Sequence, residues 1–137
     1  MPISRFAFGL ALALGFLPAA AACADELMPM DTASVDPDLL KSMYGPWVIT
    51  DQSGGKRCNV VLKDEPTIGG SVIEIDPGCA TVFPVMADIA AWRLMEGWAI
   101  TLVDPERKTR IRFTTPDDVY VADPETDGIF TILHPQQ

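Results

Sequence analysis

Short runs in which apolar and polar residues alternate occupy most of the chain after residue 44, and they limit the folds it can adopt. Arg57 to Lys63 is the clearest run, because Cys58, Val60 and Leu62 share one face of an extended chain. An alternation with a period of two gives a strand one buried face, as an antiparallel sheet requires. The expected strands, separated by turn signals or by one irregular crossing, are 47–51, 57–63, 71–76, 91–95, 98–104, 110–115, 119–122 and 129–134.

This number of short strands is typical of an all-β sandwich or barrel. The sequence after residue 44 shows no long amphipathic helix and no alternation of strands with helices. Closing an eight-stranded sheet removes its exposed edges, and the interior is then filled by side chains or holds one small ligand. We therefore favour a closed eight-stranded antiparallel barrel over a sandwich, and we place it at residues 45–137.

The first 24 residues have the order of features found in an export signal. A start that carries Arg5 is followed by the apolar run 6–17 and by small residues around Cys23. The run is shorter than the ~20 apolar residues of a membrane-spanning helix, and no later stretch approaches that length. We expect residues 1–24 to be a signal peptide, with Asp25 as the first mature residue. In the alternative, cleavage before Cys23 allows that thiol to carry a lipid, as in bacterial lipoproteins.

Export leaves two cysteines, Cys58 and Cys79, in the folded part of the chain. In an oxidising compartment, two cysteines of a small domain are expected to pair. The loop they close, of about 21 residues, would stabilise the fold by roughly 3 kcal/mol. Neither thiol has another Cys or a His at the spacing of metal ligands, so we expect a structural disulfide.

Residues 25–44 form a polar segment without the alternation of a strand, and we expect an N-terminal arm there. Asp36 is placed to cap one or two helical turns that begin at Pro37. We expect the rest of the arm to be extended.

The sequence offers no arrangement of residues suited to catalysis. A nucleophile needs a base beside it, and the only imidazole, His134, lies three residues from the end, where we expect a frayed position. Asp36, Asp76, Asp104 and Asp123 each precede a proline, which is typical of turns rather than of acid–base pairs. We therefore expect a binding protein rather than an enzyme, with no cofactor and no bound metal.

The charge of the chain narrows the class of partner. Without Arg5, nine cationic residues remain against 19 acidic ones, which is a net charge of −10. Because phosphate binding needs clustered cations, this excess argues against nucleic acid as a partner.

Three tryptophans, Trp47, Trp92 and Trp98, lie on three different expected strands. Large aromatic side chains dominate the packing of small cores, so we expect these three to be core anchors. The alternative is that they line a ligand pocket.

Several motifs, taken in order, make this sequence resemble the Inh family. The resemblance covers about residues 39–133. Members of this family are periplasmic inhibitors of secreted bacterial metalloproteases, and they are related to outer-membrane lipoproteins. The motifs are Gly45-Pro46-Trp47, Arg57-Cys58-Asn59-Val60-Val61-Leu62, Gly78-Cys79, Ala91-Trp92 and Gly97-Trp98-Ala99-Ile100-Thr101-Leu102-Val103-Asp104.

The resemblance implies a lipocalin-like barrel with a disulfide between Cys58 and Cys79. It implies a location in the periplasm and, as partner, a secreted zinc metalloprotease of the serralysin type. We expect the protein to be a monomer. If Cys23 is lipidated instead, the protein belongs to the outer membrane.

The resemblance also implies a mechanism of inhibition. Members insert their mature N-terminal segment into the protease cleft, and the terminal residues approach the zinc. A free α-amine titrates near 8, so its neutral fraction can bind a metal. The segment before the G-x-W motif has 20 residues here and is longer than in typical members. The residues expected to enter the cleft are Asp25, Glu26, Leu27 and Met28.

Two alternatives stand beside inhibition. Residues 25–27 could be a disordered terminus without a role in binding. The barrel could also serve as an envelope lipoprotein or bind a small apolar ligand, without inhibiting a protease.

Overall fold

The computed structural model describes residue 15 and residues 27–135. The expected signal peptide, apart from Gly15, lies outside the described residues, and so do Asp25 and Glu26 of the arm. Within the described part of the chain, no helix has the length and apolar character needed to cross a membrane.

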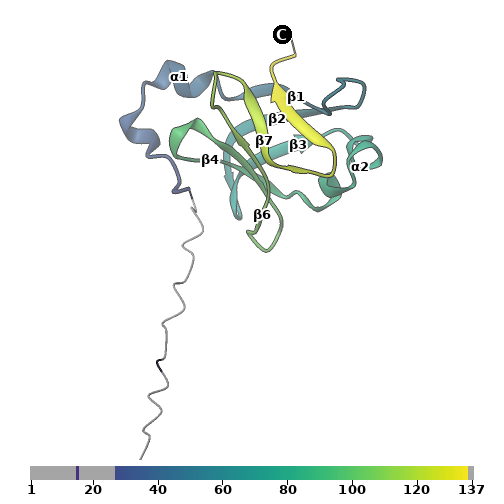
Figure 1. Ribbon diagram of the computed structural model, residues 1–137. Coiled ribbons are helices and arrows are strands. Elements are labelled where there is room, and N and C mark those ends of the chain that lie inside the picture. The colour runs from purple at the N-terminus through teal and green to yellow at the C-terminus, as the bar shows by residue number, and fades with distance from the viewer. Residues whose placement is uncertain (1–14, 16–26, 136–137) are drawn as a thin grey trace, which may run out of the picture.

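Eight antiparallel strands pair in chain order and close into a barrel, because β1 pairs with both β2 and β8 (Figure 1). The fold predicted from the alternation is therefore confirmed. The strands are β1 (Gly45–Thr50), β2 (Arg57–Thr67), β3 (Gly70–Ile75), β4 (Ala91–Leu94), β5 (Ile100–Val103), β6 (Thr109–Thr114), β7 (Tyr120–Thr126) and β8 (Ile129–Leu133).

Short helices occupy both ends of the barrel. At the arm end, where β1 begins and β4 ends, η1 and α1 precede the first strand (Figure 1). At the far end, where β3 ends and β4 begins, α2 and η2 form the crossing between these two strands. The helices are η1 (Thr32–Ser34), α1 (Pro37–Lys41), α2 (Cys79–Val82), η2 (Pro84–Asp88) and η3 (Glu96–Trp98).

The interior of the barrel is filled by apolar side chains from the strands, and β3 and β7 contribute only partly buried ones. Trp47 and Trp92 are 3% and 2% exposed, so both are buried. The indole N–H of Trp92 donates to the carbonyl of Lys63 at 2.9 Å, which satisfies a polar group that burial would otherwise penalise. The fully buried members include Ile49, Leu62, Phe83, Ile100, Leu102, Ile111, Phe113, Ile129 and Ile132.

The predicted disulfide between Cys58 and Cys79 is present. It joins β2 to the start of α2, so it holds the far-end crossing against the barrel wall. From this crossing, Phe83, Val85 and Met86 reach the core and cover the far end of the barrel.

Trp98 was expected on a strand, but it lies in η3 and is only partly buried. Gly97 and Trp98 have φ values of 72° and 64°, so the chain turns through two left-handed residues before β5 begins at Ile100. A strand cannot continue through that conformation, which explains why the predicted strand 98–104 began too early.

The last hairpin turn is also shorter than the sequence indicated. The predicted turn over 123–128 is largely strand, because β7 continues to Thr126 and pairs there with Ile129. Asp127 and Gly128 alone form the turn, with φ values of 56° and 81°. An Asp-Gly pair suits a two-residue hairpin turn, which needs positive φ at both positions.

Gly45 of the G-x-W motif has a φ of 108°, a conformation that other residues rarely adopt. We expect Gly45→Ala to lower the free energy of unfolding by about 1–2 kcal/mol, measured by urea denaturation. Gly78→Ala is the matched control, since Gly78 has a φ of −78° and an added Cβ would also meet no atom. An equal effect of both substitutions would contradict the assignment of strain to Gly45.

Candidate functional site

Main-chain hydrogen bonds attach the N-terminal arm to the end of β4. The N–H of Met30 donates to the carbonyl of Leu94 at 3.1 Å, and the N–H of Glu96 donates to the carbonyl of Met28 at 2.8 Å. The proline between the two methionines forms an antiparallel bridge with Met95. The arm therefore begins as a short added strand rather than as a free segment.

The edge that receives the arm is open because β3 covers only part of β4. The single register pair between these strands is Ser71 with Trp92, and β3 begins at Gly70. A Cβ on Gly70 would lie 2.4 Å from the carbonyl oxygen of Trp92, so glycine allows the strands to meet there. Beyond that point, the arm takes the place of β3 beside β4.

The segment between the attached residues and β1 forms two short capped helices, η1 and α1, neither of which has a buried residue. Asp31 and Asp36 each accept a hydrogen bond from the main chain two residues on and so cap η1 and α1. For Asp36 this confirms the predicted cap. Met43 is buried, and the ring of Tyr44 meets Trp92 edge-on at 6.0 Å. The extra length of this arm is thus taken up by these helical turns, and Met43 and Tyr44 join the segment to the barrel.

Two of the four residues expected to enter a protease are described. Leu27 is partly buried at the start of the attached segment, and Met28 is 62% exposed although its carbonyl is bonded to Glu96. Asp25 and Glu26 lie outside the described residues. The attached part of the arm therefore reaches back to Met28.

An aromatic cluster closes the arm end of the barrel. The indole N–H of Trp47 donates to the carbonyl of Met43 at 2.9 Å, and the ring of Tyr120 meets Trp47 edge-on at 5.6 Å. The hydroxyl of Tyr120 donates to the carbonyl of Trp98 at 2.6 Å. His134, expected to be frayed, lies against Trp47 with ring centroids 3.8 Å apart. Stacking on the buried indole holds this histidine in place.

The tyrosines of the arm end supply a test by titration. Burial raises the pKa of Tyr120 to about 12, and burial together with the charge of Asp64 raises the pKa of Tyr44. The unfolded chain releases these protons near pH 10. Stability is therefore full below about pH 10 and falls as the pH rises through 12. We expect the tyrosinate absorbance of Tyr120 in the folded protein to appear only near pH 12, and a native titration of Tyr120 centred at pH 10 would contradict this packing.

Three exposed apolar side chains lie at the arm end. Within residues 27–135, four large hydrophobic residues are 56–73% exposed. Met28 lies in the arm, Leu39 in α1 and Val119 in the turn before β7. The fourth, Ile68, lies in the turn between β2 and β3, where a Cβ on the neighbouring Gly69 would lie 3.5 Å from the side chain of Arg107 in the turn between β5 and β6. Apolar residues that project around one part of a surface are typical of a protein-binding site.

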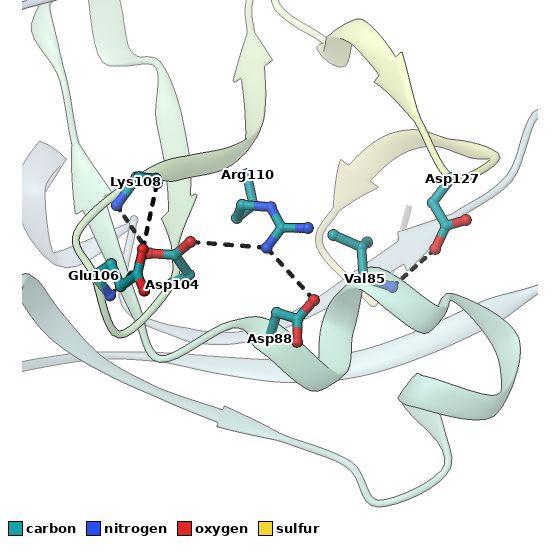
Figure 2. A network of polar contacts seen from close by, with 7 residues as sticks. All are labelled: Val85, Asp88, Asp104, Glu106, Lys108, Arg110 and Asp127. Carbon is teal, nitrogen blue, oxygen red and sulfur yellow. Dashed lines mark hydrogen bonds and ion pairs between the residues drawn. The ribbon is translucent and has the colours of Figure 1, made fainter.

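The far end carries a polar network with a structural role (Figure 2). Asp104 is 8% exposed and accepts hydrogen bonds from the N–H groups of Glu106 and Lys108, at 2.9 and 3.0 Å. Arg110 lies 3.7 Å from Asp104 and 3.4 Å from Asp88, so it joins the turn between β5 and β6 to η2. These bonds build the turn predicted at Asp104, and the carboxylate faces no catalytic partner.

Among the described residues, no group of three His, Cys, Asp or Glu side chains could hold a metal ion. In this part of the chain, the imidazole of His134 is packed on Trp47. What the arm end presents is an anchored arm together with exposed apolar side chains of the arm, of α1 and of the turn before β7, an arrangement suited to binding another protein.

A family model described as protease inhibitor Inh matches residues 38–133, which is more than half of the chain. The chain belongs to the Inh family of protease inhibitors. The match runs from α1 to the end of β8, so it covers the whole barrel and excludes most of the arm. No curated protein and no solved structure matched the chain.

Sequence reasoning about this Inh-family chain missed the parts of the surface that depend on distant pairing. It did not predict that the arm pairs with the end of β4, and it did not identify Leu39, Ile68 and Val119 as exposed apolar residues of the surface. One signal was available. Ile68 and Val119 are apolar residues next to turn residues, where solvated side chains are the norm.

Proposed function

We propose that this protein inhibits a secreted zinc metalloprotease of the serralysin type, with its mature N-terminus placed in the protease cleft. Membership of a protease inhibitor family supports the inhibitory role. The observation that carries the mechanism is the main-chain pairing of Met28 and Met30 with β4, since it gives the arm a fixed origin on the barrel. A segment that leaves a rigid support loses less conformational entropy when it binds.

The chemical groups at the proposed mature N-terminus suit binding to a catalytic zinc ion. Catalytic zinc keeps one coordination position open to water or substrate. The α-amine of a mature chain that begins at Asp25 titrates near 8, so a neutral fraction is present at physiological pH to act as a ligand. The carboxylates of Asp25 and Glu26 add acidic groups beside a divalent cation.

The reach of the arm sets how closely the barrel must approach the protease. Only residues 25–27 precede the attached segment. Three extended residues span roughly 10 Å. The arm end of the barrel must therefore lie against the rim of the cleft, and its exposed apolar residues supply the remaining contact.

We expect the double variant Leu39→Ser/Val119→Ser to weaken inhibition by about tenfold or more, because each side chain buries apolar area at the rim. The inhibition constant measures this. Stability should change little, since these side chains are already 56% and 57% exposed. Lys56→Ser, in an exposed turn at the far end, is the control and should leave inhibition unchanged. Equal potency of the double variant and the control would place the interface elsewhere.

The packed interior argues against a small apolar ligand as the natural partner. Side chains such as Trp92, Phe83 and Phe113 fill the inside of the barrel and are at most 2% exposed. The hollows of about 730, 540 and 470 Å³ found among the described residues are lined by turns, the arm and the outer faces of strands. A barrel of eight strands has room for side chains or a ligand in its centre, and here the side chains occupy it.

The test of the proposal is an inhibition assay with mature protein. At micromolar concentration the protein should slow a serralysin-type zinc protease and should leave a serine protease unaffected. Full activity of the zinc protease in the presence of the mature chain would refute the proposed function.

We further propose a periplasmic location, with cleavage of the signal before Asp25. The features of residues 1–24 support export. Mass spectrometry of the mature protein should then give a chain that begins at Asp25. A lipid on Cys23 would show an outer-membrane lipoprotein instead, and it would leave extra residues ahead of the arm.

A further inference from the structure

We infer that the outer surface of β4, β5 and β6 carries a binding site for carboxylate groups of a protein partner. The site is a groove of about 730 Å³ that runs from the attached arm to the turn between β5 and β6. We call it the arginine groove. It is defined by Arg93, Thr101, Arg107, Lys108, Arg110 and Arg112.

The groove concentrates positive charge on an acidic protein. Five of the ten Lys and Arg residues of the chain line it, although the net charge of the chain is −9. One acidic residue, Asp123, is on its lining. A hollow lined by one sign of charge focuses the electric field and attracts groups of the opposite sign.

The centre of the groove is a row of three side chains on neighbouring strands. Arg93 of β4 is in register with Thr101 of β5, which is in register with Arg112 of β6. The neighbouring residues Ile100 and Leu102 point into the core, so the row lies on the outer face of the sheet. Adjacent strands lie about 4.8 Å apart, so the two arginines flank the threonine at similar distances.

Both flanking arginines are held in place and keep donors for a ligand. The Nε of Arg93 donates to the carbonyl of Gly69, and the Nε of Arg112 donates to the carbonyl of Asp123 at 3.1 Å. Within residues 27–135, no ion pair joins Arg93, Arg107 or Arg112 to a carboxylate. A guanidinium has further N–H donors in a planar fork, which matches the geometry of a carboxylate.

Thr101 marks the point at which a ligand would sit. The residue is 2% exposed, and its hydroxyl has no hydrogen-bond partner among the described residues. Buried hydroxyls are nearly always paired, so an unpaired one on the lining of a groove indicates a missing acceptor. An oxygen of a carboxylate held between Arg93 and Arg112 would supply that acceptor.

Two of the other cations of the groove, Arg110 and Lys108, are already engaged. Arg110 pairs with Asp88 and Asp104 at 3.4 and 3.7 Å, and Lys108 pairs with Glu106 at 3.3 Å. They hold the turn that forms the far wall of the groove and leave the central row as the binding centre.

The location indicates the partner. Leu27, Met28 and Pro29 of the attached arm line one end of the groove, so a protein bound by the arm lies beside it. On the proposed function, the occupant is therefore an acidic side chain on the surface of the target protease. The groove would orient that protease on the barrel and speed its association at low ionic strength.

The first test uses the protease. Arg93→Gln/Arg112→Gln should weaken inhibition at least about tenfold at low salt and flatten its dependence on salt concentration. Thr101→Val, which removes only the hydroxyl, should weaken inhibition without lowering the free energy of unfolding. Lys56→Gln/Arg57→Gln removes the same charge at the far end and is the control. Salt dependence equal to that of the unmodified protein in the first variant would overturn the proposal.

The second test does not depend on inhibition. A hexaglutamate peptide, added at low salt to the mature protein labelled with ¹⁵N, should shift the amide signals of Arg93, Thr101 and Arg112. The shifts should disappear in the double arginine variant and persist in the control. If the protein inhibits no protease but these shifts occur, carboxylate binding by the arginine groove is supported and the proposed function is wrong. Absence of shifts at these three residues would overturn the groove.

Discussion

Removal of residues 25–27 from the mature chain is expected to reduce inhibition at least about 100-fold. These residues precede the segment that is bonded to β4, so their loss takes away the part of the arm proposed to reach the zinc. The barrel should keep its stability, because the hydrogen bonds of Met28 and Met30 to the end of β4 remain. The inhibition constant and the urea midpoint measure the two effects separately.

A matched variant distinguishes the terminal amine from the side chains of the arm. Two glycines added before Asp25 keep every residue of the arm but move the α-amine by roughly 7 Å. We expect this extension to weaken inhibition strongly as well. Undiminished potency of the shortened chain would contradict the arm mechanism, whereas loss in the shortened chain alone would assign the effect to the side chains.

Loss of the disulfide is expected to lower the free energy of unfolding by about 3 kcal/mol. Cys58 and Cys79 are 21 residues apart, and the bond fastens the crossing of α2 and η2 to β2. In Cys58→Ser/Cys79→Ser, the unfolded chain gains freedom and the far end keeps only weaker ties. One of these ties is the hydrogen bond from the N–H of Val85 to Asp127 at 2.8 Å (Figure 2).

The disulfide variant should still inhibit at temperatures where it is folded, because the disulfide lies at the far end and the arm at the other. Urea denaturation of the variant and of the reduced unmodified protein should agree within about 1 kcal/mol. A loss of potency in the folded variant would contradict this expectation, because it would show that the two ends of the barrel are coupled.

The fold could be predicted because its signals are local. Alternation such as that of Cys58, Val60 and Leu62 gave each strand a buried face, and the structure places these three side chains in the core. The helix cap at Asp36 and the disulfide between Cys58 and Cys79 could also be predicted, since each depends on residue type and spacing. The number of strands favoured closure into a barrel over a sandwich.

The features that were not predicted depend on backbone geometry and strand register, which cannot be deduced from residue types alone. Trp98 follows a polar turn and precedes an alternating run, as a strand residue would, but left-handed φ values at Gly97 and Trp98 delay the strand. The bridge between Pro29 and Met95 joins residues far apart in sequence, and it is too short to leave a pattern. The row of Arg93, Thr101 and Arg112 exists only through strand register.

The most direct test of the central claim is the visible absorption spectrum of a target protease in which Co²⁺ replaces the zinc. The spectrum of Co²⁺ changes with its ligands, so it reports whether the arm reaches the metal. We expect stoichiometric mature protein to change the spectrum, and the chain without residues 25–27 to leave it unchanged. Inhibition without any change in the spectrum would contradict placement of the mature N-terminus at the metal.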